Sequence, residues 1–169
     1  TAREFEVALP NELNREEQIS LVRDYVKENF VDRGMVADIC LHDKEDGNPH
    51  AHVLLTTRRI DENGFKQKER DWNKKEILEQ WREDWANKTN IALEKAGREE
   101  RIDHRSYATQ GIEKIPTIHE GSIARAIEQK MIEQGLEPHS ERGDINREIR
   151  KQNIKLAKIN EQVISLVKY

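Results

Sequence analysis

Three histidines in the first third of the chain have the spacing of a metal site. His50 and His52 are two residues apart in the run HAHVLLTT, so on a β-strand their side chains leave the same face. His42 ends a second strand-like run, MVADICLH, and residues 43–49 separate it from His50. If this loop turns the chain back as a hairpin, the three imidazoles converge. Neutral imidazoles suit zinc, manganese, nickel and similar ions, and three protein ligands leave positions open for water or substrate oxygen. The expected cofactor is a divalent ion, Mn²⁺, Mg²⁺, Ni²⁺ or Zn²⁺.

A strand histidine is more often an ordinary surface or core residue than a ligand. A third histidine at hairpin distance counts against that alternative, because burying several imidazoles without partners is costly. The spacing therefore predicts a catalytic metal site made by His42, His50 and His52.

Two acidic residues precede this site in the alternating run REFEVALP, residues 3–10. The alternation predicts a strand with Glu4 and Glu6 on one face and apolar side chains on the other. Beside the hairpin, these carboxylates could orient a histidine ring or act as a base. The alternative is a solvent-facing edge of the sheet, and the pattern alone leaves both open.

The elements that position these residues can be predicted from periodicity. Asn14 followed by Glu17 resembles an N-cap with its capping box, and apolar residues continue at helical spacing until Gly34. The alternating runs Met35–His42 and His50–Thr57 then predict two antiparallel strands. A polar stretch, residues 60–70, predicts a loop or short hairpin.

A second helix is expected from Asp71, as its cap, to the neighbourhood of Gly97. Its tryptophans recur at helical spacing, which favours a core position over base stacking; they are Trp72, Trp81 and Trp85.

The remainder of the chain predicts a helical extension. Residues 101–120 have no clear periodicity, Ser122–Gln134 predicts a short helix, and Asp144 is expected to open a last helix. We therefore expect an α+β fold, an antiparallel sheet flanked by helices, with a metal-binding core at 1–121 and an extension at 122–169.

Composition limits the class of protein. With 169 residues, 35% hydrophobic and 37% charged, the chain predicts one modest core. It has no apolar run long enough for membrane insertion, and the single cysteine, Cys40, favours a reducing, cytoplasmic location. The net charge of −4 means that nucleic-acid binding would need local basic patches. Because Thr1 already lies in a strand-like run, we expect upstream residues to be missing.

Six segments, in order, carry a family resemblance. They are REFEVALP (3–10), NPHAHVLLTTR (48–58), RDWN (70–73), DHRSY (103–107), PTIHEG (116–121) and RGDINREI (142–149). Together they resemble the plasmid mobilisation relaxases of the MobA/MobL family, within the His-hydrophobic-His (HUH) endonuclease superfamily. The resemblance implies a DNA-nicking enzyme for conjugation that binds single-stranded DNA at a transfer origin, cuts it through a tyrosine and a metal ion, and rejoins it. Accessory mobilisation proteins are further expected partners.

The resemblance also assigns roles and exposes a departure. His42, His50 and His52 match the ligands, Glu4 matches an acidic residue near the tyrosine, and Glu6 is a second candidate. The family's tyrosine lies upstream of the REFEVALP segment, so none of this chain's tyrosines matches it; they are Tyr25, Tyr107 and Tyr169. We expect Tyr107 to be a half-buried aromatic. The chain is thus predicted to bind metal but to lack the covalent nucleophile.

Two basic stretches, one interleaved with tryptophan, are candidates for following DNA phosphates. The predicted DNA-binding residues are Arg58, Lys66, Lys68, Arg70, Lys74, Arg101 and Arg105. The basic last helix either touches DNA or stays solvated. Two alternatives to a relaxase remain: a non-catalytic, metal-stabilised DNA-binding module, and a metal phosphodiesterase that uses activated water.

Overall fold

The computed structural model describes residues 2–43 and 47–167, without the side chains of 161 and 163–167. It divides into two compact units, Thr1–His104 and Arg105–Tyr169. Unit 1 contains, in order, β1 (Ala2–Ala8), α1 (Arg15–Asn29), η1 (Val31–Arg33), β2 (Ala37–His42), β3 (His50–Thr56), β4 (Arg58–Asp61), β5 (Gly64–Lys68), η2 (Asp71–Asn73) and α2 (Lys75–Lys95). Unit 2 contains α3 (Ser122–Glu133) and α4 (Glu141–Val167). The division expected from the sequence, between a core at 1–121 and an extension at 122–169, stays a prediction.

The main sheet of unit 1 has the strand order β1-β3-β2, with both pairs antiparallel. Its register aligns Phe5 and Ile39 with Val53 of the central strand. Because successive side chains alternate between faces, this register buries Ala51, Val53 and Leu55 on one side. The side chains of His50 and His52 therefore leave the opposite side.

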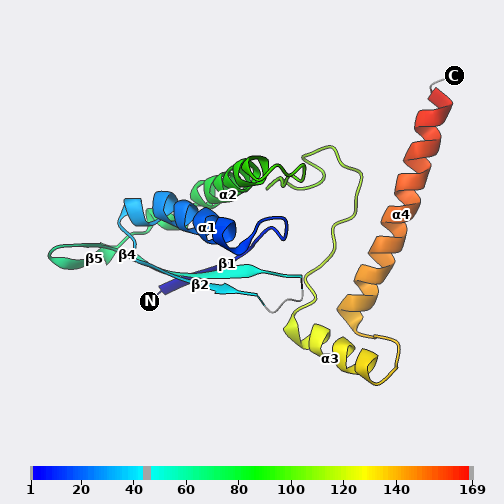
Figure 1. The fold of residues 1–169 in the computed structure, drawn as a ribbon, viewed down its shortest axis with the longest axis horizontal. Helices are drawn as coiled ribbons and strands as arrows, with labels where there is room; N and C mark the ends of the chain where they lie inside the picture. Colours follow the sequence, from blue (N-terminus) through cyan, green and yellow to red (C-terminus); the bar gives the residue numbers. More distant parts are fainter. Residues whose placement is uncertain (1, 44–46, 168–169) are drawn as a thin grey trace. The chain divides into compact units, whose positions relative to one another are not determined.

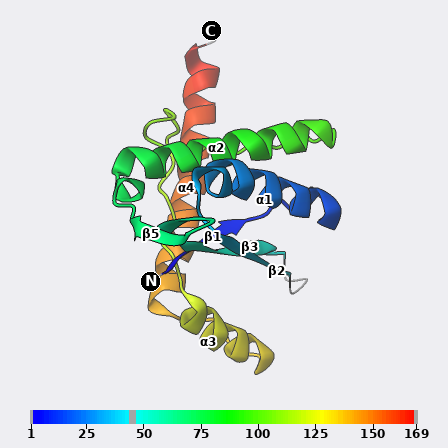
Figure 2. The ribbon, with the colours of Figure 1, turned by 90° about the vertical axis from the view of Figure 1, so that its left-hand side faces the viewer.

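Helices α1 and α2 cover the face of the sheet that carries these buried residues (Figures 1 and 2). Val22 and Val26 of α1 and Trp81 of α2 join them in one hydrophobic cluster. The tryptophans, expected to be core, are confirmed there: Trp72 and Trp81 are buried and Trp85 packs against the cluster. The expected α+β fold, an antiparallel sheet flanked by helices, is confirmed.

The predicted start of α1 is also confirmed. The Asn14 side chain accepts hydrogen bonds from the backbone N–H groups of Glu16 and Glu17, both at 3.0 Å. The Glu17 carboxylate accepts the Asn14 N–H at 2.8 Å, which completes the capping box. These bonds pair amides that the helix itself leaves without partners.

Two predicted helix starts were wrong by several residues. Asp71 lies in the 3₁₀ turn η2, and its carboxylate pairs with Lys74 at 2.9 Å, so α2 begins only at Lys75. The last helix begins at Glu141 rather than at Asp144, because Ser140 already closes its first turn. The Ser140 hydroxyl accepts the Gly143 N–H at 3.1 Å, and its carbonyl accepts the Asp144 N–H at 2.8 Å.

The polar stretch after β3, expected to be a loop or a short hairpin, forms a hairpin. Strands β4 and β5 pair antiparallel around the Asn63-Gly64 turn, where Gly64 has φ +94°. That left-handed backbone is accessible to glycine without steric cost. Residues 101–120, where no periodicity was found, contain no helix or strand.

Candidate metal centre

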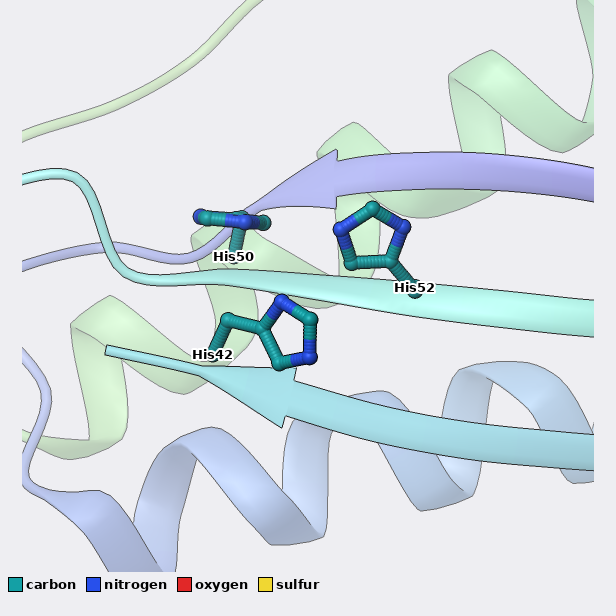
Figure 3. Close-up of side chains that lie close together, drawn as sticks. All are labelled: His42, His50 and His52. Carbon is teal, nitrogen blue, oxygen red and sulfur yellow. The ribbon is translucent and has the colours of Figure 1, made fainter. Parts of the chain in front are cut away.

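The three predicted histidines lie together on the face of the sheet opposite α1 and α2 (Figure 3). His42 on β2 is the direct register partner of His50 on β3, and His52 follows two residues later on the same face. The ring centroids are 4.7 Å apart for His42 and His52, 5.2 Å for His50 and His52, and 5.4 Å for His42 and His50. One nitrogen from each ring lies within 4.8 Å of the other two. Pairing of β2 with β3 therefore gathers three imidazoles from a stretch of eleven residues, 42–52.

Two of the three rings are oriented by hydrogen bonds at Nδ1. The Nδ1 of His50 lies 2.8 Å from the Asn48 carbonyl oxygen, and the Nδ1 of His52 lies 3.0 Å from Oε1 of Glu4. Carbonyl and carboxylate oxygens only accept, so each Nδ1 must carry the proton in these bonds. Each Nε2 then keeps its lone pair for a metal ion. A metal-binding histidine is commonly oriented this way, by a partner at its second nitrogen.

The two acidic residues of β1 differ in their relation to His52. Glu4 contacts Nδ1, whereas Oε2 of Glu6 lies 4.0 Å from Nε2. Both carboxylates are exposed, while His52 is half-buried between the flanking strands. Glu4 is thus arranged to orient the ring, and Glu6 lies on the side where an ion and its other ligands would bind.

This donor set fits a divalent ion. Three imidazole nitrogens suit zinc, manganese or nickel, and three protein ligands leave coordination positions for water or a phosphate oxygen. The exposed side of the sheet leaves those positions open, since His42 is exposed and His50 and His52 are only half-buried. Open coordination positions of this kind are typical of catalytic metal sites, whereas structural sites are closed by a fourth protein ligand.

The contribution of the Asn48 carbonyl to the site was not anticipated from the sequence. The Asn48 carbonyl orients His50, and the adjoining loop is anchored by two bonds to the chain after β1. The Leu9 N–H donates to the Pro49 carbonyl at 2.8 Å, and Asn11 Nδ2 donates to the Gly47 carbonyl at 2.9 Å. A backbone carbonyl has no side-chain signature, so no sequence pattern identified this role.

No tyrosine among the described residues of unit 1 lies at the histidines. Tyr25 is 3% exposed in the opposite, helical layer, where its hydroxyl donates to the Trp81 carbonyl at 2.9 Å. Burial, reinforced by the charge of Asp84, raises the pKa of this hydroxyl well above its ordinary value. Tyr107 belongs to unit 2 and is 39% exposed, more open than the half-buried position expected, and Tyr169 lies outside the described residues.

The predicted DNA-binding residues fall into separate places. Arg58, Lys66 and Lys68 lie on the β4–β5 hairpin, which leaves β3 at the end away from His50 (Figure 1). Arg70 and Lys74 flank η2. The Arg101 guanidinium donates to backbone carbonyls of neighbouring residues, and Arg105 is in unit 2; the structure does not bring these seven residues together as one patch.

A cavity of about 870 Å³ lies where the edge strand β1 faces α2. Its walls include Trp81, while Glu4, Glu6 and Lys74 also line it. Both predicted catalytic carboxylates and one predicted DNA-binding lysine therefore line the same cavity.

Fold and site together define a class of protein: an α+β domain whose antiparallel sheet presents a histidine triad on the face opposite α1 and α2. Comparison with known proteins agrees with this description. The model of the MobA/MobL family matches residues 1–130, and this chain belongs to that family.

Curated relatives extend the match through most of unit 2. The conjugal transfer protein TraA of Agrobacterium fabrum (strain C58) is 37% identical over 184 residues, which cover 96% of this chain but 17% of that relative. The probable mobilization protein MobA of Bifidobacterium longum is 32% identical, over 96% of this chain and 35% of its own length. This chain therefore spans only a minor part of the relatives that it matches.

A solved structure agrees with the fold. The protein described under "Molecular Basis of Vancomycin Resistance Transfer in Staphylococcus aureus" aligns with TM-score 0.58 and 37% sequence identity, covering 63% of this chain and 58% of its own. Among the described residues, no helix is long and apolar enough to cross a membrane.

Proposed function

We propose that this chain is the metal-binding part of a relaxase that nicks and rejoins one DNA strand at a plasmid transfer origin. The convergence of His42, His50 and His52 on one open face, with nitrogens within 4.8 Å of one another, carries the proposal. Membership of the MobA/MobL family and relatives named for conjugal transfer and mobilization support it.

The three histidines would hold a divalent ion through their available nitrogens. When bound, that ion supplies a positive charge that polarises a non-bridging oxygen of the scissile phosphate. Glu4 keeps the His52 ring in the orientation that such binding needs, through its 3.0 Å bond to Nδ1. This is a positioning role, which loss of the carboxylate charge would weaken.

The chemical step is a transesterification. A tyrosine oxygen loses its proton, bonds to phosphorus, and displaces the deoxyribose oxygen, which takes up a proton as it leaves. Glu4 and Glu6 are the candidates to accept the first proton, and Oε2 of Glu6 lies 4.0 Å from Nε2 of His52. Tyr25 is unsuited to the attack because it is buried and bonded to the Trp81 carbonyl. The tyrosine is the one that the family resemblance puts upstream of the REFEVALP segment.

The DNA strand would be held by basic side chains outside the triad. Arg58, Lys66 and Lys68 of the hairpin are exposed, as are Arg70 and Lys74, which flank η2. They extend the surface available to phosphates beyond the metal face, and Arg101 and Arg105 would add contacts in the segment that follows α2.

A second candidate function is hydrolysis of phosphodiesters by metal-activated water. The burial of Tyr25 favours it for residues 1–169 acting alone, because an open metal site needs no tyrosine to activate water. A non-catalytic DNA-binding module is the remaining alternative, and the open ligand positions count against it.

Labelled single-stranded transfer-origin DNA distinguishes these functions. We expect a chain extended to include the family's tyrosine to form a covalent protein–DNA adduct with Mn²⁺, and residues 1–169 alone to form none. His42→Ala should abolish the adduct, whereas Tyr25→Phe, the matched tyrosine control, should retain it. Failure of the extended chain both to cleave and to form an adduct would overturn the relaxase proposal. Cleavage by residues 1–169 without an adduct would instead identify the water-using hydrolase.

A further inference from the structure

Helix α4 carries asparagines at intervals of seven residues, here called the asparagine row: Asn146, Asn153 and Asn160. Residues seven apart complete nearly two helical turns, so the three side chains share one face. Asn146 is 2% exposed, which is rare for an amide side chain unless its hydrogen bonds are satisfied. The partners of this row decide which face of α4 remains available.

The asparagine row holds an extended segment of unit 2, residues 113–118, against α4. Asn146 accepts the Ile118 N–H and donates to the Ile118 carbonyl, both at 2.8 Å. Asn153 does the same for Ile115, at 2.8 and 2.9 Å. Asn160 Nδ2 donates to Oε2 of Glu113 at 3.1 Å.

The spacing of these contacts is matched on both sides. Seven helical residues rise about 10.5 Å and three extended residues span about 10 Å, so the step from Asn146 to Asn153 matches the step from Ile118 to Ile115. Asn160 reaches the side chain of Glu113, two residues before Ile115. The segment runs toward α3, in the direction opposite to that of α4 (Figure 1). One face of α4 is therefore occupied along at least two of its turns.

Three lysines lie on the opposite face of the same turns and form what we call the lysine row: Lys151, Lys155 and Lys158. Each is two residues from an asparagine of the row, which is about 200° around a helix. Their mutual spacing of four and three residues puts them on one stripe, and all three are exposed. The segment bound on one side thus leaves the lysines facing away from it.

The stretch of α4 that carries the lysine row has an excess of positive charge. No acidic residue lies between Glu148 and Glu161 in the sequence. Arg150, in the same stretch, pairs with Glu120 at 3.8 Å. Arg147, one turn earlier, is paired with Glu128 and Asp144, but none of the three lysines forms an ion pair with the side chains that the structure describes. In a chain of net charge −4, this is a concentrated local positive stripe.

We propose that the lysine row binds the phosphate backbone of single-stranded DNA. This rests on the proposed function, which brings such a strand to this protein, and adds a binding surface in unit 2 that neither the histidines nor the hairpin includes. The row extends about 10.5 Å along α4, enough to face two or three successive phosphates of one strand. Lysine ammonium groups act as point charges, so the contact is electrostatic and independent of base sequence.

Salt dependence measures such contacts directly. The binding of residues 1–169 to a labelled single-stranded oligonucleotide is followed by fluorescence anisotropy from 50 to 300 mM NaCl, beside the variant Lys151→Gln/Lys155→Gln/Lys158→Gln. Each phosphate contact to a single strand contributes about 0.7 to the slope of log K against log salt. We expect the slope to fall by about 2 and the affinity at 0.1 M salt to fall roughly tenfold to a hundredfold.

Matched variants separate the row from bulk charge. Lys27→Gln/Lys95→Gln/Lys130→Gln removes the same charge at three exposed lysines elsewhere and should leave the slope nearly unchanged. Lys→Arg at the three positions of the row should retain it. The proposal would be overturned if both glutamine triples lost the same DNA affinity, or if the variant Lys151→Gln/Lys155→Gln/Lys158→Gln lost none. A loss of affinity for duplex DNA alone would overturn it as well. Mn²⁺ affinity, measured on the same samples, should not change, and it reports separately on the histidine site.

Discussion

The two faces of β3 show how one strand divides stability from chemistry. Ala51, Val53 and Leu55 are at most 1% exposed and pack under the helices, whereas His50 and His52 face the open side. Neighbouring residues along this strand therefore contribute to different properties of the protein. Substitutions one residue apart should separate metal binding from the free energy of unfolding.

The largest expected effect is on metal affinity. His52→Ala removes one of three ligands, and we expect loss of measurable high-affinity Zn²⁺ or Mn²⁺ binding by isothermal titration calorimetry, with little change in the apo protein's unfolding midpoint. His119→Ala, which removes a histidine of unit 2, is the matched control and should bind as the unsubstituted chain does. Undiminished binding by His52→Ala would contradict the triad.

The reverse outcome is expected on the buried face. Leu55 is 1% exposed, so Leu55→Ala should lower the free energy of unfolding by about 2–5 kcal/mol, measured by urea denaturation. Leu54 on the open face is 46% exposed, and Leu54→Ala should cost less than about 0.5 kcal/mol. Similar costs at the two positions would mean that the faces are not divided as described.

A metal ion bound on the open face should also stabilise the whole fold, because binding favours the folded state by mass action. An ion that binds only the folded state should raise the unfolding free energy by about 2.7 kcal/mol at a hundred times its dissociation constant. We expect EDTA to reverse this gain, as measured by thermal denaturation. His42→Ala should show no such gain, and a gain equal to that of the unsubstituted chain would show that the ion binds elsewhere.

The smallest effect tests orientation rather than ligation. Glu4→Gln keeps the size of the side chain but removes the charge that holds the proton on Nδ1 of His52, and it should weaken metal binding about 10- to 100-fold. Glu12→Gln, a substitution at a partly exposed position after β1, should leave the affinity unchanged. NMR of the His52 ring nitrogens would report the tautomer, and an unchanged tautomer and affinity would exclude the orienting role.

Sequence reasoning succeeded where a pattern is local. The two-residue period identified the faces of β1, β2 and β3, and the chain distance from His42 to His50 was enough to predict that the rings converge. The starts of α2 and α4 were less predictable, because Asp71 pairs with Lys74 and Ser140 caps the helix ahead of Asp144.

Contacts between distant segments could be predicted only in outline. Glu4 was a candidate to orient a histidine ring, but the choice of His52, 48 residues away, depends on the register of β1 against β3, which the sequence does not encode locally. The asparagine row was not anticipated, and nothing in its seven-residue spacing identifies residues 113–118 as its partner. Such pairings are decided by tertiary packing.

The placement of the tryptophans in the core under the helices also gives the protein a built-in optical reporter. All three tryptophans, Trp72, Trp81 and Trp85, lie on that side, and the Tyr25 ring is 5.0 Å from that of Trp85, close enough for efficient energy transfer. Tryptophan emission should therefore follow unfolding of the core. Zn²⁺, which has a filled d shell, should load the opposite side of the sheet without changing that signal.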